Sequence, residues 1–390
     1  MNILVLDLGN YIDYPLGGQL SFAKNLITAF GKDAKLVGIS TEKDEIIGKW
    51  HKKVINNIEY DYYSVAYVKK TFKRPFIPRR ITSFFQLKPH IKNILNTINY
   101  DLIFIQAPEL LLCLSDQYLS KTFVVLPGVE NPLIISRYPF AKKLKDLYDF
   151  LFINKLKKVK YIFASADEAE IQNLLKRSKG AIQREQIIKY PTRYDSSIYY
   201  YQNREEIKQY LNLDLNTKII TTVGRLAWFK GWKFMIDAFN IVQQKYSEKI
   251  HFYFLGNGED KENIQNYIKE KHLEDKITLL GNQPPIQVAH YLNASDVFIM
   301  GSYKEGWSTT LVEACACCVP CVVTNFSSAE EMIENGINGY VIKTRSEEEF
   351  ANQIIKSLIF DRAKIIEFNN KYKSLAVNKM RESLENNMHF

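Results

Sequence analysis

The sequence has few cysteines, no long apolar run and no Asp-x-Asp pair. Five of the 390 residues are cysteines, and four of these fall between residues 315 and 321, which is not the spacing of a secreted disulfide framework. The apolar stretches at 102–114 and 314–323 contain proline and are shorter than the ~18–20 residues of a spanning helix. The start MNILVLDLGN lacks a basic leader, which favours a first strand over a signal peptide. We expect a cytoplasmic protein with reduced thiols, at most attached to the cytoplasmic face of the inner membrane.

Acidic residues are missing from one stretch of the chain. No Asp or Glu occurs from Tyr62 to Tyr100, a segment that interleaves lysine and arginine with aromatic residues, and a second basic amphipathic stretch covers 142–160. Residues 1–200 hold 30 basic against 19 acidic side chains, whereas residues 201–390 hold 22 against 24. Two interpretations remain open for these stretches: contact with an anionic membrane, or a solvated lysine-rich surface. We disfavour nucleic acid as the partner.

The length favours two domains of ~150–200 residues each. Short β-branched runs alternate with amphipathic stretches in both halves, which predicts two doubly wound α/β domains whose strand ends face a cleft. A polar stretch at 191–217 separates the halves. We predict a first domain at 1–200, a second at 201–365 and a C-terminal helix at 366–390 that packs back on the first domain. This helix belongs to a long polar helical stretch that starts near Ser346.

Two loops between strands and helices have features of phosphate sites. Gly17 and Gly18 precede a predicted helix, where glycines let the backbone approach a phosphate, although a simple turn is equally compatible. The strand 219–223 ends in Gly224-Arg225-Leu226, followed by Lys230-Gly231. Two cations five residues apart can both contact one diphosphate. The only GxG element, Gly256-Asn257-Gly258, lacks the third glycine of a dinucleotide fingerprint.

The third loop is the most informative. After the strand 297–300, Glu305 precedes a predicted helix that contains Glu313, and Ser308 or Thr309 would cap this helix. The helix N-terminus could bind a phosphate, while the two carboxylates, up to ~12 Å apart, could bind hydroxyls on either side of it. A nucleotide sugar has this layout of ribose, diphosphate and sugar. Acidic residues near a helix start are also common without any ligand.

These motifs together resemble the retaining GT-B glycosyltransferases of family 4. The resemblance covers residues 218–345 in order and spacing, through Gly224-Arg225-Leu226, Lys230-Gly231, Gly256-Asn257-Gly258, Glu305-x7-Glu313, Pro320, Glu331 and Asn338-Gly339. It implies that Arg225 and Lys230 neutralise the donor diphosphate, that Glu305 contacts the transferred sugar and that Glu313 binds the ribose. The remaining donor-binding candidates are the loop glycines and the start of the helix: Gly17, Gly18, Gly224, Gly256, Gly258, Gly306, Trp307, Ser308, Thr309, Thr310 and Leu311. Such enzymes need neither a metal nor another cofactor.

One feature departs from the family pattern. Many relatives carry a histidine after the strand that here covers 122–126, whereas this chain has Glu130 nearby and no suitable histidine. Either Glu130 or Glu109 stands near the acceptor, or the leaving phosphate of the donor acts as the base. The cysteine cluster at 315–321 lacks a second cluster, so we favour buried small residues over a zinc site.

The resemblance and the basic stretches indicate a glycosyltransferase that uses UDP or GDP sugars. The acceptor that we expect is a lipid-linked glycan of a bacterial surface polysaccharide, such as lipopolysaccharide O-antigen or capsule. Two alternatives remain: a soluble glycosyltransferase that acts on a free acceptor, and a non-catalytic binder of nucleotide sugars or nucleic acid. The absent histidine motivates the binder of nucleotide sugars, and the basic first half motivates the binder of nucleic acid.

Overall fold

The computed structural model describes residues 1–14, 18–71, 77, 79–126, 129, 131, 133–134 and 139–388. The chain divides into two units, one formed by Met1–Pro191 with the C-terminal residues from Lys379 onward, the other by Thr192–Asn378. The sequence places this division at residue 200; in the structure it lies nearer Pro191. The reason is that the backbone of Tyr194 pairs with Leu375 and Val377 of the second unit, at 3.1 and 2.8 Å.

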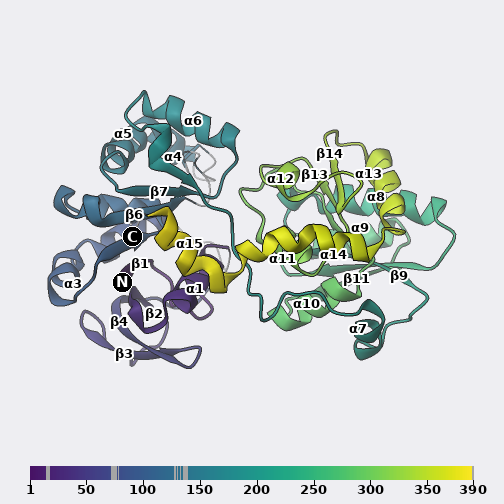
Figure 1. Ribbon diagram of the computed structural model, residues 1–390, viewed down its shortest axis with the longest axis horizontal. Helices are drawn as coiled ribbons and strands as arrows, with labels where there is room; N and C mark the ends of the chain where they lie inside the picture. The colour runs from purple at the N-terminus through teal and green to yellow at the C-terminus, as the bar shows by residue number, and fades with distance from the viewer. Residues whose placement is uncertain are drawn as a thin grey trace. The chain divides into compact units, whose positions relative to one another are not determined.

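The first unit contains an eight-stranded sheet in the order β3-β4-β2-β1-β5-β6-β7-β8, parallel except for the pairing of β3 with β4 (Figure 1). The strands are β1 (Ile3–Leu6), β2 (Ala34–Ser40), β3 (Trp50–Ile55), β4 (Ile58–Tyr67), β5 (Leu102–Ile105), β6 (Thr122–Leu126), β7 (Tyr161–Ala164) and β8 (Ile187–Lys189). The inner strands read as continuous apolar runs because both of their faces are covered.

Helices connect these strands. They are α1 (Gly18–Phe30), α2 (Arg79–Leu87), α3 (Ile91–Thr97), α4 (Pro139–Lys142), α5 (Lys145–Leu156), α6 (Glu168–Ser178) and α15 (Met380–Asn387), with the 3-10 turns η1 (Gly31–Asp33), η2 (Pro108–Cys113), η3 (Asp116–Lys121) and η4 (Arg184–Gln186). The alternation of strand-like and helix-like stretches in the sequence did not predict the hairpin β3–β4. Asn56 and Asn57 form its turn with φ of 49° and 63°, left-handed values that asparagine tolerates better than most residues.

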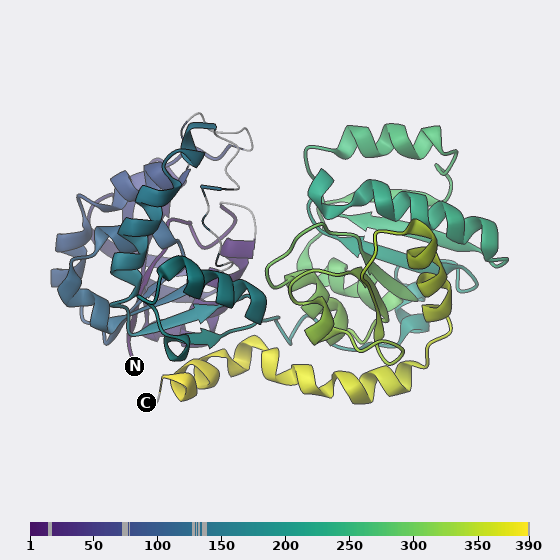
Figure 2. The same ribbon diagram turned by 90° about the horizontal axis from the view of Figure 1, so that it is seen from above.

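The second unit is a fully parallel sheet in the order β11-β10-β9-β12-β13-β14. Its strands are β9 (Lys218–Val223), β10 (Ile250–Leu255), β11 (Ile277–Gly281), β12 (Val297–Met300), β13 (Cys321–Thr324) and β14 (Gly339–Ile342). Its helices are α7 (Arg204–Tyr210), α8 (Trp232–Lys245), α9 (Lys261–Glu270), α10 (Pro285–Ala294), α11 (Thr309–Ala316), α12 (Ala329–Met332), α13 (Glu347–Ser357) and α14 (Arg362–Asn369), with the turns η5 (Trp228–Lys230), η6 (Asn370–Leu375) and η7 (Val377–Lys379). Helices cover both faces of this sheet (Figure 2), and an apolar core lies on each side.

The C-terminal stretch is not one long helix. It consists of α13, α14, two 3-10 turns and α15. Ser346 caps the start of α13, and Asp361 caps the start of a separate helix, α14, by accepting from the Ala363 N–H at 2.9 Å. Residues up to Asn378 stay with the second unit. In the first unit α15 lies beside α1 (Figure 1), where Arg381 forms an ion pair with Asp33 at 2.8 Å.

Two α/β units with parallel sheets confirm the predicted fold class. Among the described residues, no helix is both long and apolar enough to cross a bilayer.

Candidate functional site

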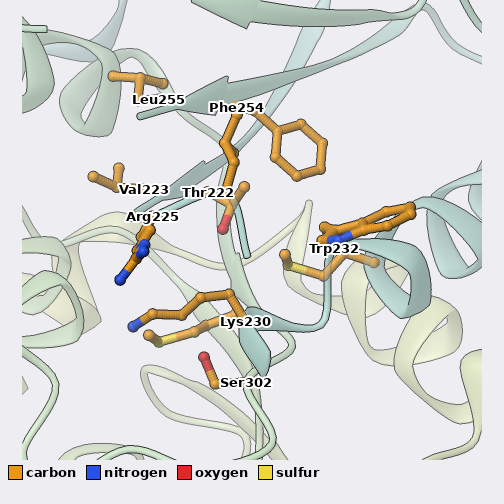
Figure 3. Close-up of a pocket in the computed structure, with 12 residues that line it drawn as sticks. Thr222, Val223, Arg225, Lys230, Trp232, Phe254, Leu255 and Ser302 are labelled. Atoms are coloured by element: carbon orange, nitrogen blue, oxygen red, sulfur yellow. The ribbon is translucent and has the colours of Figure 1, made fainter. Parts of the chain in front are cut away.

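A pocket lies at the carboxyl ends of β9, β10 and β12 in the second unit. Because these strands are parallel neighbours, the loops that follow them meet at one edge of the sheet. The lining residues are Thr222, Val223, Gly224, Arg225, Leu226, Lys230, Trp232, Met235, Phe254, Leu255, Met300 and Ser302. Figure 3 shows Arg225 and Lys230 extending in the same direction, with their nitrogen atoms on one side. The loop after β9 therefore presents two cations together, as the sequence predicts.

Gly256 and Gly258 do not line this pocket. A Cβ on Gly256, whose φ is +136°, would lie 1.9 Å from the carbonyl oxygen of Gly224, and one on Gly258 would lie 2.2 Å from that of Leu226. The two loops are joined by backbone hydrogen bonds from Gly224 to Leu255 and from Leu226 to Asn257, at 2.9 and 3.1 Å. These glycines thus position the loop that carries Arg225, whereas Gly224 borders open space.

Lys230 and Glu305 meet in the structure although 75 residues separate them. The Lys230 Nζ donates to Oε1 of Glu305 at 2.5 Å, and the buried Ser302 hydroxyl donates to the same oxygen at 2.7 Å. Both charged side chains are mostly buried. No described residue donates to Oε2, which leaves this carboxylate oxygen available to a ligand. Ser302 was not predicted from the sequence, where no pattern distinguishes it from other loop serines.

Close backbone packing holds the two loops together. Gly231 is the N-cap residue of α8 with φ of +71°, and a Cβ there would lie 1.9 Å from the Gly301 carbonyl oxygen. The Arg345 guanidinium donates to the same carbonyl at 2.8 Å and stacks on the Tyr303 ring, 3.6 Å from its centroid. Arg345 also went unpredicted, because the contact depends on the path of the loop after β14.

Arg225 has an exposed partner outside the pocket. Its Nε donates to Glu259 at 2.9 Å, and the Arg225 side chain is 58% exposed. An exposed pair of this kind contributes about 0–1 kcal/mol, so an anionic ligand can compete with Glu259 for the guanidinium.

The N-terminus of α11 is capped as predicted. The Ser308 hydroxyl accepts from the Leu311 N–H at 3.3 Å, and the Ser308 N–H donates to Ser328 at 3.3 Å. Among the described residues, no acceptor is found for the N–H groups of Thr309 and Thr310, which are partly exposed. Trp307 is buried and its carbonyl accepts from Thr192 at 3.1 Å, while Gly306 is partly exposed. The first turn can therefore offer amide groups to an anion.

Glu313 lies further along α11 in a desolvated setting. Burial raises the pKa of its carboxyl to about 8, and the hydroxyl of Tyr199 opposes this shift by hydrogen bonding to the carboxylate. Burial and the nearby Glu313 together raise the pKa of Tyr199. Tyr199 is buried in the core beside α11 and was not predicted as a site residue. Glu313 is partly exposed, and its carboxyl oxygens can accept hydroxyl groups of a ligand.

The acceptor-side candidates belong to the first unit. Glu109 lies in η2, directly after β5. Glu130 and Gly17 lie outside the described residues, and Gly18 is the first residue of α1. The two histidines among the described residues of this unit have structural partners, His51 with Glu45 at 3.1 Å and His90 with Tyr63 at 3.1 Å.

The clustered cysteines are buried along α11 and β13. Cys315, Cys317, Cys318 and Cys321 are all free thiols, and burial raises the pKa of three of them. Within the part of the chain that the structure describes, no group of cysteine, histidine and carboxylate side chains could hold a metal ion.

Comparison with known proteins agrees with this geometry. Residues 203–373, which contain the whole pocket, match the family of glycosyl transferases group 1. The matched residues all lie within the second unit. The match leaves out the first unit, where sequence resemblance was thin.

Curated relatives match over part of the chain. N-acetyl-alpha-D-glucosaminyl L-malate synthase of Bacillus anthracis is 27% identical over 164 residues, 42% of each chain. UDP-Gal:alpha-D-GlcNAc-diphosphoundecaprenol alpha-1,3-galactosyltransferase of Escherichia coli is 28% identical over 157 residues, 40% of each chain. A third relative is a putative teichuronic acid biosynthesis glycosyltransferase of Bacillus subtilis, 30% identical over 40% of this chain and 36% of that protein. The chain thus spans about two fifths of the length of these relatives.

Solved structures share the fold over the full length. Sucrose-phosphate synthase of Thermosynechococcus elongatus aligns with a TM-score of 0.76 at 14% identity, over 100% of this chain and 99% of that one. HepE of Anabaena, in complex with UDP and glucose, aligns with a TM-score of 0.69 at 19% identity, over 99% and 100%. These likenesses confirm the GT-B fold.

Proposed function

We propose that this chain transfers a sugar from a nucleoside-diphosphate sugar to a glycan acceptor, with retention of the anomeric configuration. The observation that carries the proposal is the pair of cations, Arg225 and Lys230, on the loop after β9 beside the loop that bears Glu305. The diphosphate would bind to these cations and to the amides of Thr309 and Thr310. UDP is the favoured donor nucleotide, with GDP as the alternative, because a relative is named as UDP-Gal-dependent and a structural neighbour holds UDP.

The chemistry follows from charge that develops on the leaving diphosphate. Fixed cations and amide dipoles stabilise this charge without reorganisation, and no metal ion is needed for the step. We propose that Oε2 of Glu305 accepts a hydroxyl of the transferred sugar, and that Glu313 accepts the ribose hydroxyls. We assign no residue of the described first unit as the base. Instead, the phosphate oxygen that leaves the sugar would take the proton from the attacking hydroxyl of the acceptor.

The acceptor that we propose is lipid-linked, as in bacterial surface polysaccharide synthesis. Large apolar side chains are exposed on two helices of the first unit that both pack against η2. On α2 they include Phe85, 67% exposed, and on α5 they include Phe150, 66% exposed. The exposed apolar surface consists of Ile81 and Phe85 on α2, of Leu147, Phe150 and Leu151 on α5, of Phe140 on α4, and of Leu144 between α4 and α5.

This exposed apolar surface adjoins a basic one. Helix α5 buries Phe152, Ile153 and Leu156 against the core, while the apolar residues on its opposite side are largely exposed. Lys142, Lys143 and Lys145 are exposed beside them. Apolar side chains flanked by lysines suit a bilayer with anionic headgroups. This supports action at a membrane surface over the alternative of a free acceptor.

Donor binding can be tested by calorimetric titration of UDP, GDP and ADP. We expect one nucleotide to bind wild type, and Arg225→Met and Lys230→Met each to weaken its affinity by about tenfold or more, since charge-assisted contacts are worth about 1.5–3 kcal/mol. Lys249→Met, on an exposed lysine of the same unit, serves as the matched control. Equal affinity in wild type and both site variants would refute the proposed site.

Membrane contact can be tested by flotation with phosphatidylglycerol vesicles. We expect wild type to float at low salt, and a Phe85→Ser, Phe150→Ser double variant to remain in solution. Ile359→Ser is the control, because Ile359 is 82% exposed but lies in the second unit. If wild type does not bind the vesicles and still transfers sugar to a free acceptor at full rate, this result would favour the soluble alternative.

A further inference from the structure

Trp228 is an exposed tryptophan at the edge of the candidate site. It begins η5, two residues before Lys230, and the residue is 64% exposed. The other three tryptophans of the chain are buried or partly buried. A tryptophan has more apolar surface to hide than any other residue, so this exposure leaves a large apolar face in water.

The indole of Trp228 is supported from within the protein. The Tyr303 ring lies 5.7 Å from it, centroid to centroid, at 48°, and the Phe229 ring lies 6.2 Å away edge to face. The Tyr303 N–H donates to the Phe229 carbonyl oxygen at 2.8 Å, which ties the two loops together. Arg345 covers the Tyr303 ring in turn. The indole is therefore held in place before any ligand binds, which lowers the entropic cost of binding.

The position of this supported indole relates it to the sugar end of the site. Trp228 is two residues from Lys230, and Tyr303 is two residues from Glu305. Lys230 and Glu305 are themselves joined by a hydrogen bond of 2.5 Å. Glu305 is the residue proposed to contact the transferred sugar. Glu313, proposed to hold the ribose, lies on α11 beside Tyr199. Because the Trp228 and Tyr303 rings are 5.7 Å apart and each residue is two positions from a member of the Lys230–Glu305 pair, we infer that the exposed ring borders the proposed sugar contact.

We propose that the exposed face of Trp228 stacks on a sugar ring of the acceptor glycan. The inference rests on the proposed function and names a contact for its acceptor. A pyranose ring has an apolar face of C–H groups and a rim of hydroxyls. Stacking buries the C–H face against the indole while the hydroxyls stay in water, so the contact gains apolar burial without losing hydrogen bonds.

Tryptophan fluorescence offers a direct test in the presence of saturating UDP. We would titrate maltotetraose, chitotetraose and mannotetraose into wild type, Trp228→Phe and Trp228→Ala, and measure affinity in parallel by saturation-transfer NMR. We expect at least one tetrasaccharide to change the emission of wild type. Trp228→Phe should lose this change yet keep its affinity within about threefold, whereas Trp228→Ala should lose about tenfold or more, as anchoring aromatic residues do.

The matched control is Tyr210→Ala, which removes an exposed aromatic ring from α7 in the same unit. It should bind UDP and the tetrasaccharide as wild type does. Unchanged tetrasaccharide affinity in Trp228→Ala would overturn the proposal. The proposal would also be overturned if wild type binds UDP but none of the three tetrasaccharides changes its emission. A loss of UDP affinity in Trp228→Ala would instead indicate stacking on the nucleobase. Failure of wild type to bind UDP would count against the proposed function itself.

Discussion

The ammonium group of Lys230 lies 2.5 Å from Oε1 of Glu305, and Ser302 donates to the same oxygen at 2.7 Å. Each charge is therefore compensated in the absence of a ligand, although both side chains are mostly buried. A diphosphate that approaches Lys230 finds a cation already oriented by Glu305. The pair thus serves stability and proposed donor binding at once.

This pairing predicts different stabilities for two variants that should both lose donor affinity. Lys230→Met leaves the Glu305 carboxylate partly buried and without its cation, which should cost about 1–3 kcal/mol of unfolding free energy. Arg225→Met removes only an exposed pair with Glu259 and should cost about 0–1 kcal/mol. Urea denaturation of both variants checks this. The double variant Lys230→Met, Glu305→Gln should recover part of the loss; no recovery would mean that the cost lies elsewhere.

The raised pKa of Glu313 predicts a pH-dependent stability. Its pKa in the folded protein is about 8, against a usual value of 4.5. The folded state therefore keeps a proton that the unfolded state releases above pH 4.5. Stability conferred by the neutral carboxyl is complete below pH 4.5, falls as the pH rises toward 8, and is constant above it.

Glu313→Gln removes this titration while retaining a group that can accept from Tyr199. The variant should match wild type near pH 4 and become more stable than wild type toward pH 8, by on the order of a few kcal/mol. Denaturant titrations at several pH values between 4 and 9 measure the difference. A difference that does not depend on pH would contradict the assignment of the raised pKa to Glu313.

Gly256 should be irreplaceable because of a close backbone contact. A methyl group there would lie 1.9 Å from the Gly224 carbonyl oxygen, so Gly256→Ala must displace the loop that carries Arg225. We expect about 1–3 kcal/mol of destabilisation and a clear loss of UDP affinity. Gly336→Ala is the control, since Gly336 also has positive φ, +81°, but has open space around it. Titration calorimetry distinguishes the two; equal UDP affinities would contradict the loop-positioning role.

Much of the fold and part of the site could be predicted from sequence. The strands β9 and β12 appear as short apolar runs, each followed by polar loop residues. Because carboxyl ends of neighbouring parallel strands share one edge, Lys230 and Glu305 could be assigned to one site from these positions. The Ser308 cap was predictable for a similar reason, since capping depends on residues close in sequence.

The remaining features depend on contacts that local patterns do not encode. Tyr199 reaches Glu313 from the segment that precedes α7, and Arg345 reaches Gly301 from beyond β14. Neither contact follows from periodicity or spacing, because each requires the path of two loops. The donor-binding roles of Gly256 and Gly258 remain predictions. The structure adds a close backbone contact for each, which could not be predicted because sequence shows that a glycine is needed but not whether a ligand or another backbone approaches it. By contrast, the helix start at Asp361 could have been predicted, because aspartate is a common N-cap residue. The continuous polar pattern led instead to the prediction of one long helical stretch.

The buried thiols predict a chemically inert native state. All five cysteines are buried, and burial raises the pKa of Cys113 to about 12 and that of Cys318 to about 11. Since the thiolate is the reactive form, we expect no thiol of the folded protein to react with Ellman's reagent at pH 8 within minutes, and all five to react in guanidinium chloride. Absorbance at the wavelength of the released thionitrobenzoate gives the count. A thiol that reacts quickly in the native protein would show that α11 or β13 opens locally; Cys318→Ala, at the turn between these elements, would then identify whether the opening begins there.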